Sequence, residues 1–374
     1  MSKILINDIG FIHGNNRVPI LERIHYWQEN GHAVSILCPP NAKSFYEQST
    51  RDVLFITIPL THEARNKITL IFEYLKRNVV CLTFLPKLVK GSDIVFSMSA
   101  LLDFLILPYV MKLINKRIRW FVVFDNVVRL DVGLKGLIRV LAFIFFRFSL
   151  LFLRRADKVF VVTNSLRQKL VSLGIEEKQM VVTGNGLETE LISRSKAFSN
   201  VSYDAIYVGR INKAKGVFDM LRVVDLVRDR YPKFLLALIG TGDRETLEEL
   251  NKDILGKKLE KNVISLGSVF GVDKFSHIKS SKLFLFLSYD ESYGVALMEA
   301  VCSGLFCVTY DVDVYDELYK NNEIITVPKG DISKAAGKVV EILSSKEFIN
   351  HRGLERQTLS WVDIAKIESG FFDA

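Results

Sequence analysis

The chain has 374 residues, of which 49% are hydrophobic and 25% are charged, so it is long enough for two hydrophobic cores of ordinary size. Every window long enough to cross a membrane contains a charged side chain, and the apolar part of the start, MSKILINDIGF, is too short for a secretory signal. We therefore expect a cytoplasmic protein. Its four cysteines lie in apolar surroundings without metal-site spacing and are expected to be buried thiols, namely Cys38, Cys81, Cys302 and Cys307.

The net charge of +8 is unevenly distributed along the chain. Residues 1–200 contain 27 Lys and Arg against 16 Asp and Glu, a net charge of +11. Residues 201–374 contain 23 against 26, a net charge of −3. This asymmetry predicts two domains with different partners.

The first half alternates apolar runs with helical patterns, which is typical of an α/β domain with a parallel sheet. The run that starts at Lys3, KILINDIGF, predicts a first strand. The segment 13–38 predicts a loop, a helix that ends at Asn30–Gly31, and a second strand. Three further apolar runs also predict strands: VLFITIP, DIVFSMS and RWFVVFDNVV.

Residues 101–155 combine 10 basic and 3 acidic side chains with many large apolar ones. Arg139, Arg147 and Arg154 are spaced eight and seven residues apart, which places them in one stripe on a helix. The stripe is either the solvated side of a core helix or an interfacial surface that binds anionic lipid, and the high positive charge favours the membrane. We do not expect a nucleic-acid partner, because the segment lacks a polar basic groove with interleaved aromatic residues.

From Arg155 to Gly186 the pattern predicts a strand, a helix capped at Asn164–Ser165, another strand and a turn. Residues 187–201, which are rich in serine and charge, predict a linker. The next strand ends at Gly209, and Arg210 and Lys215 follow it in the loop before a helix near Gly216. Two cations beside the carboxyl end of a strand suit a diphosphate, although isolated loop cations are usually only solvated.

The segment from Ser288 to Val308 follows an apolar run that predicts a buried strand, and it opens a helix near Gly294. A strand that feeds a helix in this way presents backbone N–H groups to an anion. Glu299 is the only carboxylate from Gly294 to Tyr310, so it either reaches solvent or is buried against a partner. An ionised carboxylate there can accept hydrogen bonds from both hydroxyls of a vicinal diol.

The spacing of Glu291 and Glu299, with Gly294 and Gly304 between and after them, resembles the E-x7-E donor motif of retaining glycosyltransferases with the GT-B fold, glycosyltransferase family four. The pairs Gly209-Arg210 and Lys215-Gly216 are similar to the family's phosphate-binding pairs. The resemblance implies two doubly wound, Rossmann-like α/β domains that face each other across a cleft. It implies an acceptor-side domain over 1–186, to which a C-terminal crossover helix in 355–374 returns, and a nucleotide-sugar-binding domain over 187–354.

The resemblance also implies roles for single residues. Glu291 would contact the donor sugar, Glu299 would hold the ribose hydroxyls, and Arg210 and Lys215 would stabilise the departing diphosphate. Further donor contacts are implied for Gly14, Gly209, Gly240, Tyr293, Gly294 and Val295. The acceptor side would include His13, Asn15, Asp125 and Asn126. Many relatives have a histidine after the strand at 119–124, but this chain has Phe124-Asp125-Asn126 there, so the histidine that faces the transferred sugar is missing.

The implied activity is transfer of a sugar, with retention of configuration, from a nucleotide-sugar to a glycan or lipid-linked acceptor at the cytoplasmic face of the membrane. No cofactor is expected, and no metal, because no acidic pair of the DxD type stands at a convincing strand end. Two alternatives remain open. One is a GT-B sugar-nucleotide epimerase, which needs no acceptor, and the other is a non-catalytic subunit that binds a sugar nucleotide.

Overall fold

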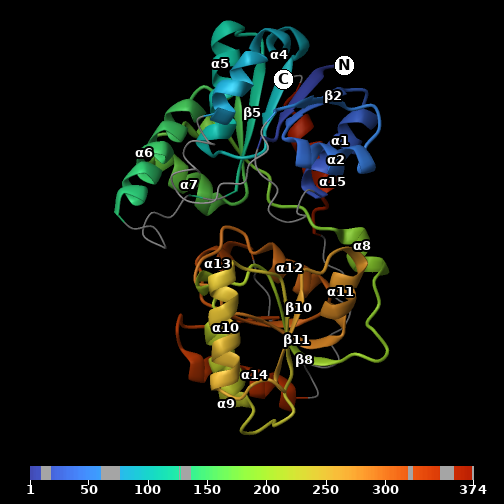
Figure 1. The fold of residues 1–374 in the computed structure, drawn as a ribbon, viewed down its shortest axis with the longest axis vertical. Coiled ribbons are helices and arrows are strands. Elements are labelled where there is room, and N and C mark those ends of the chain that lie inside the picture. The colour runs from blue at the N-terminus through green and yellow to red at the C-terminus, as the bar shows by residue number, and fades with distance from the viewer. Residues whose placement is uncertain are drawn as a thin grey trace. The chain divides into compact units, whose positions relative to one another are not determined.

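The structure is a computed structural model that describes residues 1–9, 18–59, 76–125, 127, 136–318, 323–345 and 358–372, and of residues 136–139 only the backbone. The chain divides into two compact units (Figure 1). Unit 1 comprises Met1–Gly186 together with Leu359–Ala374, and unit 2 comprises Leu187–Thr358. Each unit is built on one parallel sheet with flanking helices.

The sheet of unit 1 has seven parallel strands in the order β3-β2-β1-β4-β5-β6-β7. Residues 76–83 are also helical. The elements of unit 1 with defined bounds are β1 Lys3–Asn7, α1 Val18–Glu29, β2 Ala33–Cys38, α2 Pro40–Ser49, β3 Leu54–Thr57, α4 Leu85–Gly91, β4 Ile94–Ser97, α5 Leu102–Ile114, β5 Arg119–Phe124, α6 Gly136–Leu153, β6 Lys158–Val161, α7 Asn164–Ser172, the 3-10 turn η1 Glu177–Gln179, β7 Met180–Val182 and α15 Trp361–Ser369.

The predicted strands β4 and β5 are buried on both faces because helices flank the sheet, and this explains their nearly continuous apolar sequences. One correction concerns α7, whose cap is one residue earlier than predicted. The side chain of Thr163 accepts a hydrogen bond from the backbone N–H of Leu166, at 3.2 Å. Thr163 is extended and its hydroxyl reaches the first turn, so Asn164 already belongs to the helix.

The C-terminal helix α15 packs on α1 in unit 1. The guanidinium of Arg23 donates two hydrogen bonds to the carboxylate of Glu368, from Nε at 2.7 Å and from Nη2 at 2.6 Å. Both side chains are buried, with exposed fractions of 3% and 0%. After α15, Phe372 contributes its ring to the aromatic core between the sheet and α1, 5.3 Å from Trp27 and 5.1 Å from Phe121. Unit 1 is therefore completed by the last residues of the chain.

The sheet of unit 2 has six parallel strands in the order β10-β9-β8-β11-β12-β13. The elements of unit 2 with defined bounds are α8 Thr189–Arg194, β8 Tyr203–Val208, the 3-10 turn η2 Lys213–Lys215, α9 Val217–Val227, β9 Leu236–Ile239, α10 Arg244–Gly256, β10 Val263–Gly267, α11 Gly271–Lys279, β11 Ser281–Phe286, α12 Val295–Cys302, β12 Phe306–Tyr310, α13 Val314–Leu318, β13 Ile324–Val327 and α14 Ile332–Ser344.

The prediction of a linker over 187–201 is wrong. This segment contains α8, and Leu187 and Ile192 are buried in the core of unit 2. The ammonium of Lys279, on α11, donates hydrogen bonds to the carbonyls of Ile192 and Ser195. The segment is mostly polar, but its few apolar side chains pack into the core of unit 2. Composition alone does not reveal this packing.

The order of each sheet reverses beside its first strand, β1 in unit 1 and β8 in unit 2. In unit 2 the chain runs outward from β8 through β9 and β10, and then returns to place β11 on the other side of β8. Ligands of doubly wound folds bind beyond the carboxyl ends of the strands at such a reversal. The predicted fold class, two doubly wound α/β domains, is confirmed, and the loops after β8 and β11 are the place to look for a site.

Candidate active site

The loops that follow β8 and β11 are in direct contact. The backbone N–H of Tyr289 donates a hydrogen bond to the carbonyl of Ala214, at 2.9 Å. Gly216 has φ +70°, and a Cβ atom at this position would lie 1.8 Å from the carbonyl oxygen of Leu287. Only glycine allows such an approach of two backbones, so Gly216 fixes the two loops against each other.

This approach brings together two of the predicted catalytic residues. The ammonium Nζ of Lys215 lies 2.5 Å from Oε1 of Glu291. The two side chains are 20% and 9% exposed, so the pair is largely shielded and still reachable from solvent. The salt bridge therefore joins the loops at the carboxyl ends of β8 and β11.

A buried carboxylate behind this pair holds the loop after β11. Asp219, in the first turn of α9, accepts hydrogen bonds at Oδ2 from the hydroxyls of Tyr289, at 2.5 Å, and Tyr310, at 2.8 Å. Its Oδ1 accepts a further hydrogen bond from Arg222, at 3.1 Å. Burial, and then the hydrogen bond to Asp219, raise the pKa of the Tyr289 hydroxyl above its ordinary value. Tyr289 is two residues before Glu291, so this contact positions the carboxylate that meets Lys215.

Arg210 lies at the carboxyl end of β8 with an exposed side chain. Its backbone is fixed, because the hydroxyl of Tyr207 donates a hydrogen bond to the Arg210 carbonyl, at 2.7 Å. Within the part of the chain that the structure describes, its guanidinium forms no ion pair. The neighbouring strand also comes close, because a Cβ atom at Gly240, where φ is +138°, would lie 1.8 Å from the carbonyl oxygen of Gly209. Arg210 thus presents an exposed cation from a fixed backbone, and its charge is available to an anion.

The helix α12 begins at the same edge of the sheet. Gly294 precedes its first residue with φ +81°, and Tyr293 and Val295 on either side are partly buried. The first turn of an α-helix directs backbone N–H groups outward and favours negative charge. The structure therefore gathers the predicted residues Gly209, Arg210, Lys215, Glu291 and Gly294 at one edge of unit 2.

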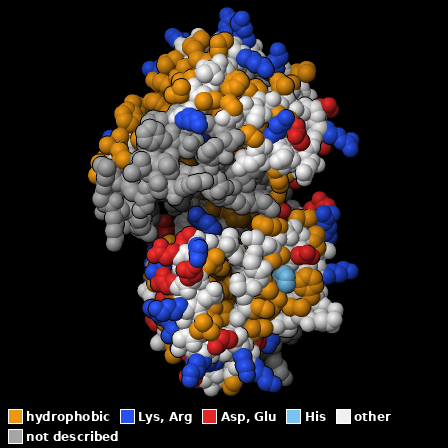
Figure 2. Space-filling view, viewed as in Figure 1, with side chains coloured by type: hydrophobic (Ala, Val, Ile, Leu, Met, Phe, Trp, Pro, Cys, Tyr) orange, Lys and Arg blue, Asp and Glu red, His pale blue; other side chains and the backbone are white. Residues whose placement is uncertain are grey.

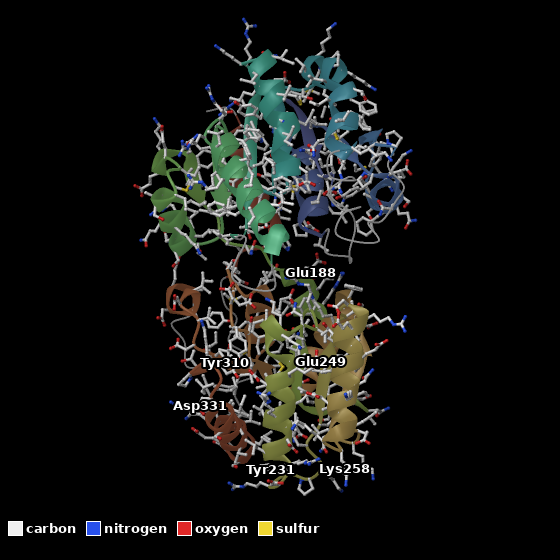
Figure 3. The ribbon with its side chains drawn as sticks, turned by 60° about the vertical axis from the view of Figure 1, so that its left-hand side comes forward. Glu188, Tyr231, Glu249, Lys258, Tyr310 and Asp331 are labelled. Atoms are coloured by element: carbon white, nitrogen blue, oxygen red, sulfur yellow. The ribbon has the colours of Figure 1, made fainter. Side chains whose placement is uncertain are left out.

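Glu299 is not solvated but buried, with an exposed fraction of 6%, and it has a partner. The ammonium of Lys274, on α11, donates hydrogen bonds to Oε1 of Glu299, at 2.8 Å, and to Oε2 of Glu188, at 3.0 Å. Burial raises the pKa of Glu299 above its ordinary value, and the charge of Lys274 opposes that effect. Figure 3 shows Glu188 at the end of unit 2 opposite to Tyr231 and Lys258, which lie in the turns before β9 and β10. The carboxylate of Glu188 thus lies toward the carboxyl ends of the strands of unit 2.

Other predicted residues are less well defined. His13, Gly14, Asn15 and Asn126 lie outside the described residues. Asp125 belongs to unit 1, where it directly follows β5 with an exposed side chain. The acceptor side therefore stays a prediction.

The helix α6 carries an exposed apolar surface. Its members occupy one side of the helix and are 39% to 54% exposed: Val140, Phe143, Ile144, Phe148 and Leu151. Arg147 on the same side and Arg154 just beyond the helix are also exposed, whereas the side chain of Arg139 lies outside the described residues. Figure 2 shows hydrophobic side chains gathered over the side of unit 1 where α6 lies. Among the helices that the structure describes, none is long and apolar enough to cross a membrane.

Sequence reasoning missed four residues of this site: Glu188, Lys274, Asp219 and Tyr289. The sequence indicates that Glu299, if buried, needs a cationic partner. It contains 50 Lys and Arg, however, and does not indicate which of them lies near Glu299. Asp219 and Tyr289 have ordinary sequence surroundings and gain their role only from tertiary contact. Among the described residues, no group of three or more His, Cys, Asp or Glu could hold a metal ion.

Comparison with known families agrees with this geometry. The model of Glycosyltransferase Family 4 matches residues 20–191, and the model of Glycosyl transferases group 1 matches residues 188–355. Together the two matches cover most of the chain, and each falls mainly on one of the two units.

Two curated relatives illustrate the similarity. The poly(glycerol-phosphate) alpha-glucosyltransferase of Bacillus subtilis is 26% identical over 157 residues, which are 42% of this chain and 23% of that protein. The capsular polysaccharide biosynthesis glycosyltransferase CapM of Staphylococcus aureus is 25% identical over 219 residues, 54% of this chain and 57% of that protein. The chain thus matches less than two thirds of the length of either relative.

Solved structures share the fold over the whole chain. The Anabaena protein HepE, in complex with UDP and glucose, has a TM-score of 0.75 at 15% identity and covers 100% of both chains. The sucrose-phosphate synthase of Thermosynechococcus elongatus has a TM-score of 0.76 at 15% identity and covers 100% of this chain and 98% of its own. The two family matches, which together span residues 20–355, and the shared fold show that the chain belongs to the glycosyltransferases with the GT-B fold.

Proposed function

We propose that this protein transfers a sugar from a nucleoside-diphosphate sugar to a glycan or lipid-linked acceptor, with retention of anomeric configuration. The observation that carries the proposal is the contact between Lys215 and Glu291 where the sheet of unit 2 reverses, together with the exposed guanidinium of Arg210 after β8. Cations and a carboxylate at one edge of the sheet suit a nucleoside-diphosphate sugar, because the cations match its diphosphate and the carboxylate can contact its sugar.

Each group has a defined task in this proposal. Arg210 and Lys215 stabilise the negative charge that develops on the diphosphate as the sugar departs, and the N–H groups of the first turn of α12 assist them. Glu291 contacts the sugar and stabilises the positive charge that develops at its anomeric carbon. Glu299 accepts hydrogen bonds from the ribose hydroxyls of the nucleotide. No metal is required, because the protein's own cations neutralise the diphosphate.

The relatives suggest which substrates to test first. HepE is described in a complex with UDP and glucose, and the Bacillus subtilis and Staphylococcus aureus relatives act on poly(glycerol-phosphate) and in capsular polysaccharide synthesis. These names favour UDP-glucose as the first donor and a cell-surface glycan or its lipid-linked precursor as the first acceptor. We place the acceptor on unit 1, where Asp125 follows β5.

We also propose that α6 binds the surface of an anionic membrane, which would bring the enzyme to a lipid-linked acceptor. Support comes from the exposed apolar surface of α6, with Arg147 within it and Arg154 beside its end. Apolar side chains that enter the interface and arginines that meet anionic headgroups are typical of helices that lie on membranes.

The test is a thermal-shift screen of the purified protein against UDP, GDP, ADP and their sugar conjugates, with and without a divalent metal. A ligand that binds only the folded protein raises the melting temperature, so one nucleotide should give a selective rise without metal. The effective conjugate is then incubated with candidate acceptors, and NMR of the product reports the anomeric configuration.

Three results would revise the proposal. No shift with any nucleotide would contradict it. Interconversion of the donor sugar without an acceptor would identify an epimerase. Binding without turnover of any donor would identify a non-catalytic sugar-nucleotide-binding subunit.

A further inference from the structure

The environment of Glu299 contains an unusual arrangement of three charges. Lys274 lies between two carboxylates, and among the described residues it is the only group that bonds the side chain of Glu299. The contact uses Oε1 of Glu299, and no residue in the described part of the chain bonds its Oε2. A buried carboxylate is therefore fixed by one oxygen, and its other oxygen remains available.

A carboxylate in this position needs its cation to be useful. Burial favours the protonated form, and it raises the pKa of Glu299. A protonated carboxyl has lost acceptor capacity, whereas an ionised one can accept from both hydroxyls of a diol. Burial also acts to lower the pKa of Lys274, but Glu299 and Glu188 outweigh it, and the pKa of the ammonium is raised above its ordinary value. Lys274 thus favours the ionised form of Glu299 and opposes the effect of burial.

We propose that Lys274 is a positioning residue for nucleotide binding: it keeps Glu299 ionised and oriented so that the carboxylate accepts hydrogen bonds from the ribose hydroxyls of a nucleoside diphosphate. This inference rests on the proposed function. It adds a residue on α11 whose effect on the nucleotide is transmitted through Glu299.

Glu188 orients the ammonium from the opposite side. Glu188 directly precedes α8. The contacts of Lys274 with Glu188 and Glu299 therefore join the start of unit 2 to α11 and α12. The side chain of Lys274 is only 12% exposed, and its position over the ring of Phe275, at 4.3 Å, limits its movement further. The ammonium is therefore a fixed group and not a flexible surface charge.

The same helix offers a matched control. Lys279, five residues later on α11, also ties this helix to the α8 segment, through hydrogen bonds to the carbonyls of Ile192 and Ser195. Loss of either ammonium removes a link between α11 and α8, but only loss of Lys274 changes the partner of Glu299. The two variants separate structural support from positioning.

The experiment measures the affinity, by calorimetry, for the nucleoside diphosphate that stabilises the wild-type protein and for its 2′,3′-dideoxy counterpart. The wild type should prefer the ribonucleotide. Lys274→Met should weaken ribonucleotide binding by about tenfold or more, the usual value of a charge-assisted hydrogen bond, and should abolish most of the preference. Lys279→Met should retain the preference. Lys274→Gln, which retains a donor without the charge, serves if the Met variant does not fold.

The pH dependence adds a second measurement. Without the Lys274 charge, the pKa of Glu299 rises further. Ribonucleotide affinity should therefore increase with pH in both proteins and reach its plateau at a higher pH in Lys274→Gln than in the wild type. Dideoxynucleotide affinity should show no such difference.

The outcomes distinguish this inference from the proposed function. A wild type that binds ribonucleotides together with a folded Lys274 variant of unchanged preference would overturn the role of Lys274 and leave the proposed function intact. A wild type that binds no nucleoside diphosphate would overturn both.

Discussion

The ammonium of Lys215 lies 2.5 Å from the carboxylate of Glu291, so a cation from the loop after β8 is paired with an anion from the loop after β11. The contact limits the movement of both side chains. Catalytic groups that are oriented in advance need little reorganisation when charge develops on the substrate.

The proposed function predicts the effect of removing either of the two cations, Lys215 or Arg210. Lys215→Ala and Arg210→Ala should each lower the turnover of the donor by about tenfold or more, because each removes a cation from the developing negative charge. Lys213→Ala is the matched control: it belongs to the same turn, but Lys213 is 69% exposed and bonds Glu249 on α10. Near-normal turnover in Lys215→Ala and Arg210→Ala would remove both cations from the site.

The Asp219 contacts predict that two tyrosines have different effects. Tyr289→Phe and Tyr310→Phe each remove one hydrogen bond to Oδ2 of Asp219 and should each cost about 0.5–1.5 kcal/mol of stability. Only Tyr289→Phe releases the loop that carries Glu291, so only it should lower kcat and speed hydrogen exchange of the backbone of 287–294. Equal kcat values in the two variants would contradict a role of Asp219 in positioning the loop.

Gly216 predicts a large cost for the smallest substitution. Gly216→Ala would bring a Cβ atom to 1.8 Å from the Leu287 carbonyl, so the two loops would have to separate. Gly330→Ala is the control, because Gly330 has a similar φ of +81° but nothing within 4 Å of the added atom. The control should lose only about 1–2 kcal/mol, the cost of left-handed backbone for a residue with a Cβ. Urea denaturation should show a larger loss for Gly216→Ala, and equal losses would refute the contact.

The buried pair of Arg23 and Glu368 predicts that single and double substitutions diverge. Arg23→Met leaves the Glu368 carboxylate buried without its cation and should cost about 3–5 kcal/mol. Combining it with Glu368→Leu removes the uncompensated charge, and the double variant should recover most of that loss. Thermal denaturation checks both, and a double variant less stable than Arg23→Met would show that the helix needs the ion pair itself.

The exposed surface of α6 predicts a membrane interaction that can be lost without unfolding. Phe143→Ser combined with Arg147→Glu should greatly weaken sedimentation with vesicles that contain anionic lipid, because one change removes an apolar insertion and the other reverses a charge. Leu255→Ser is the control, since Leu255 is 62% exposed on unit 2. Unchanged sedimentation of the α6 variant would end this proposal.

The fold could be predicted from the sequence because its signals are local. The apolar runs that became β1, β5 and β11 are bounded by glycine and polar turns, and buried parallel strands need no other information. The prediction of a linker over 187–201 is wrong for the opposite reason, because the structure of this segment depends on contacts that are distant in sequence. Only two of its residues, Leu187 and Ile192, are buried in the core, which is too few to form a recognisable pattern. Their burial depends on tertiary packing, including the packing of α8 on α11.

The site divides in the same way. Glu291, Glu299, Arg210 and Lys215 could be proposed from the sequence because they match motifs of one family, and their roles stay a prediction. The partners of these residues could not, since Lys274 and Glu188 are 86 positions apart along the chain and meet only because α8 packs on α11. The sequence states which charges need a partner, but tertiary structure selects the partner.

The return of α15 to unit 1 has a consequence for the order of folding during synthesis. All residues of unit 2 are synthesised before Glu368 and Phe372, so nascent unit 1 lacks both the carboxylate that pairs with Arg23 and the ring that packs against Trp27. Unit 2, although encoded second, is the first of the two whose own residues are all available.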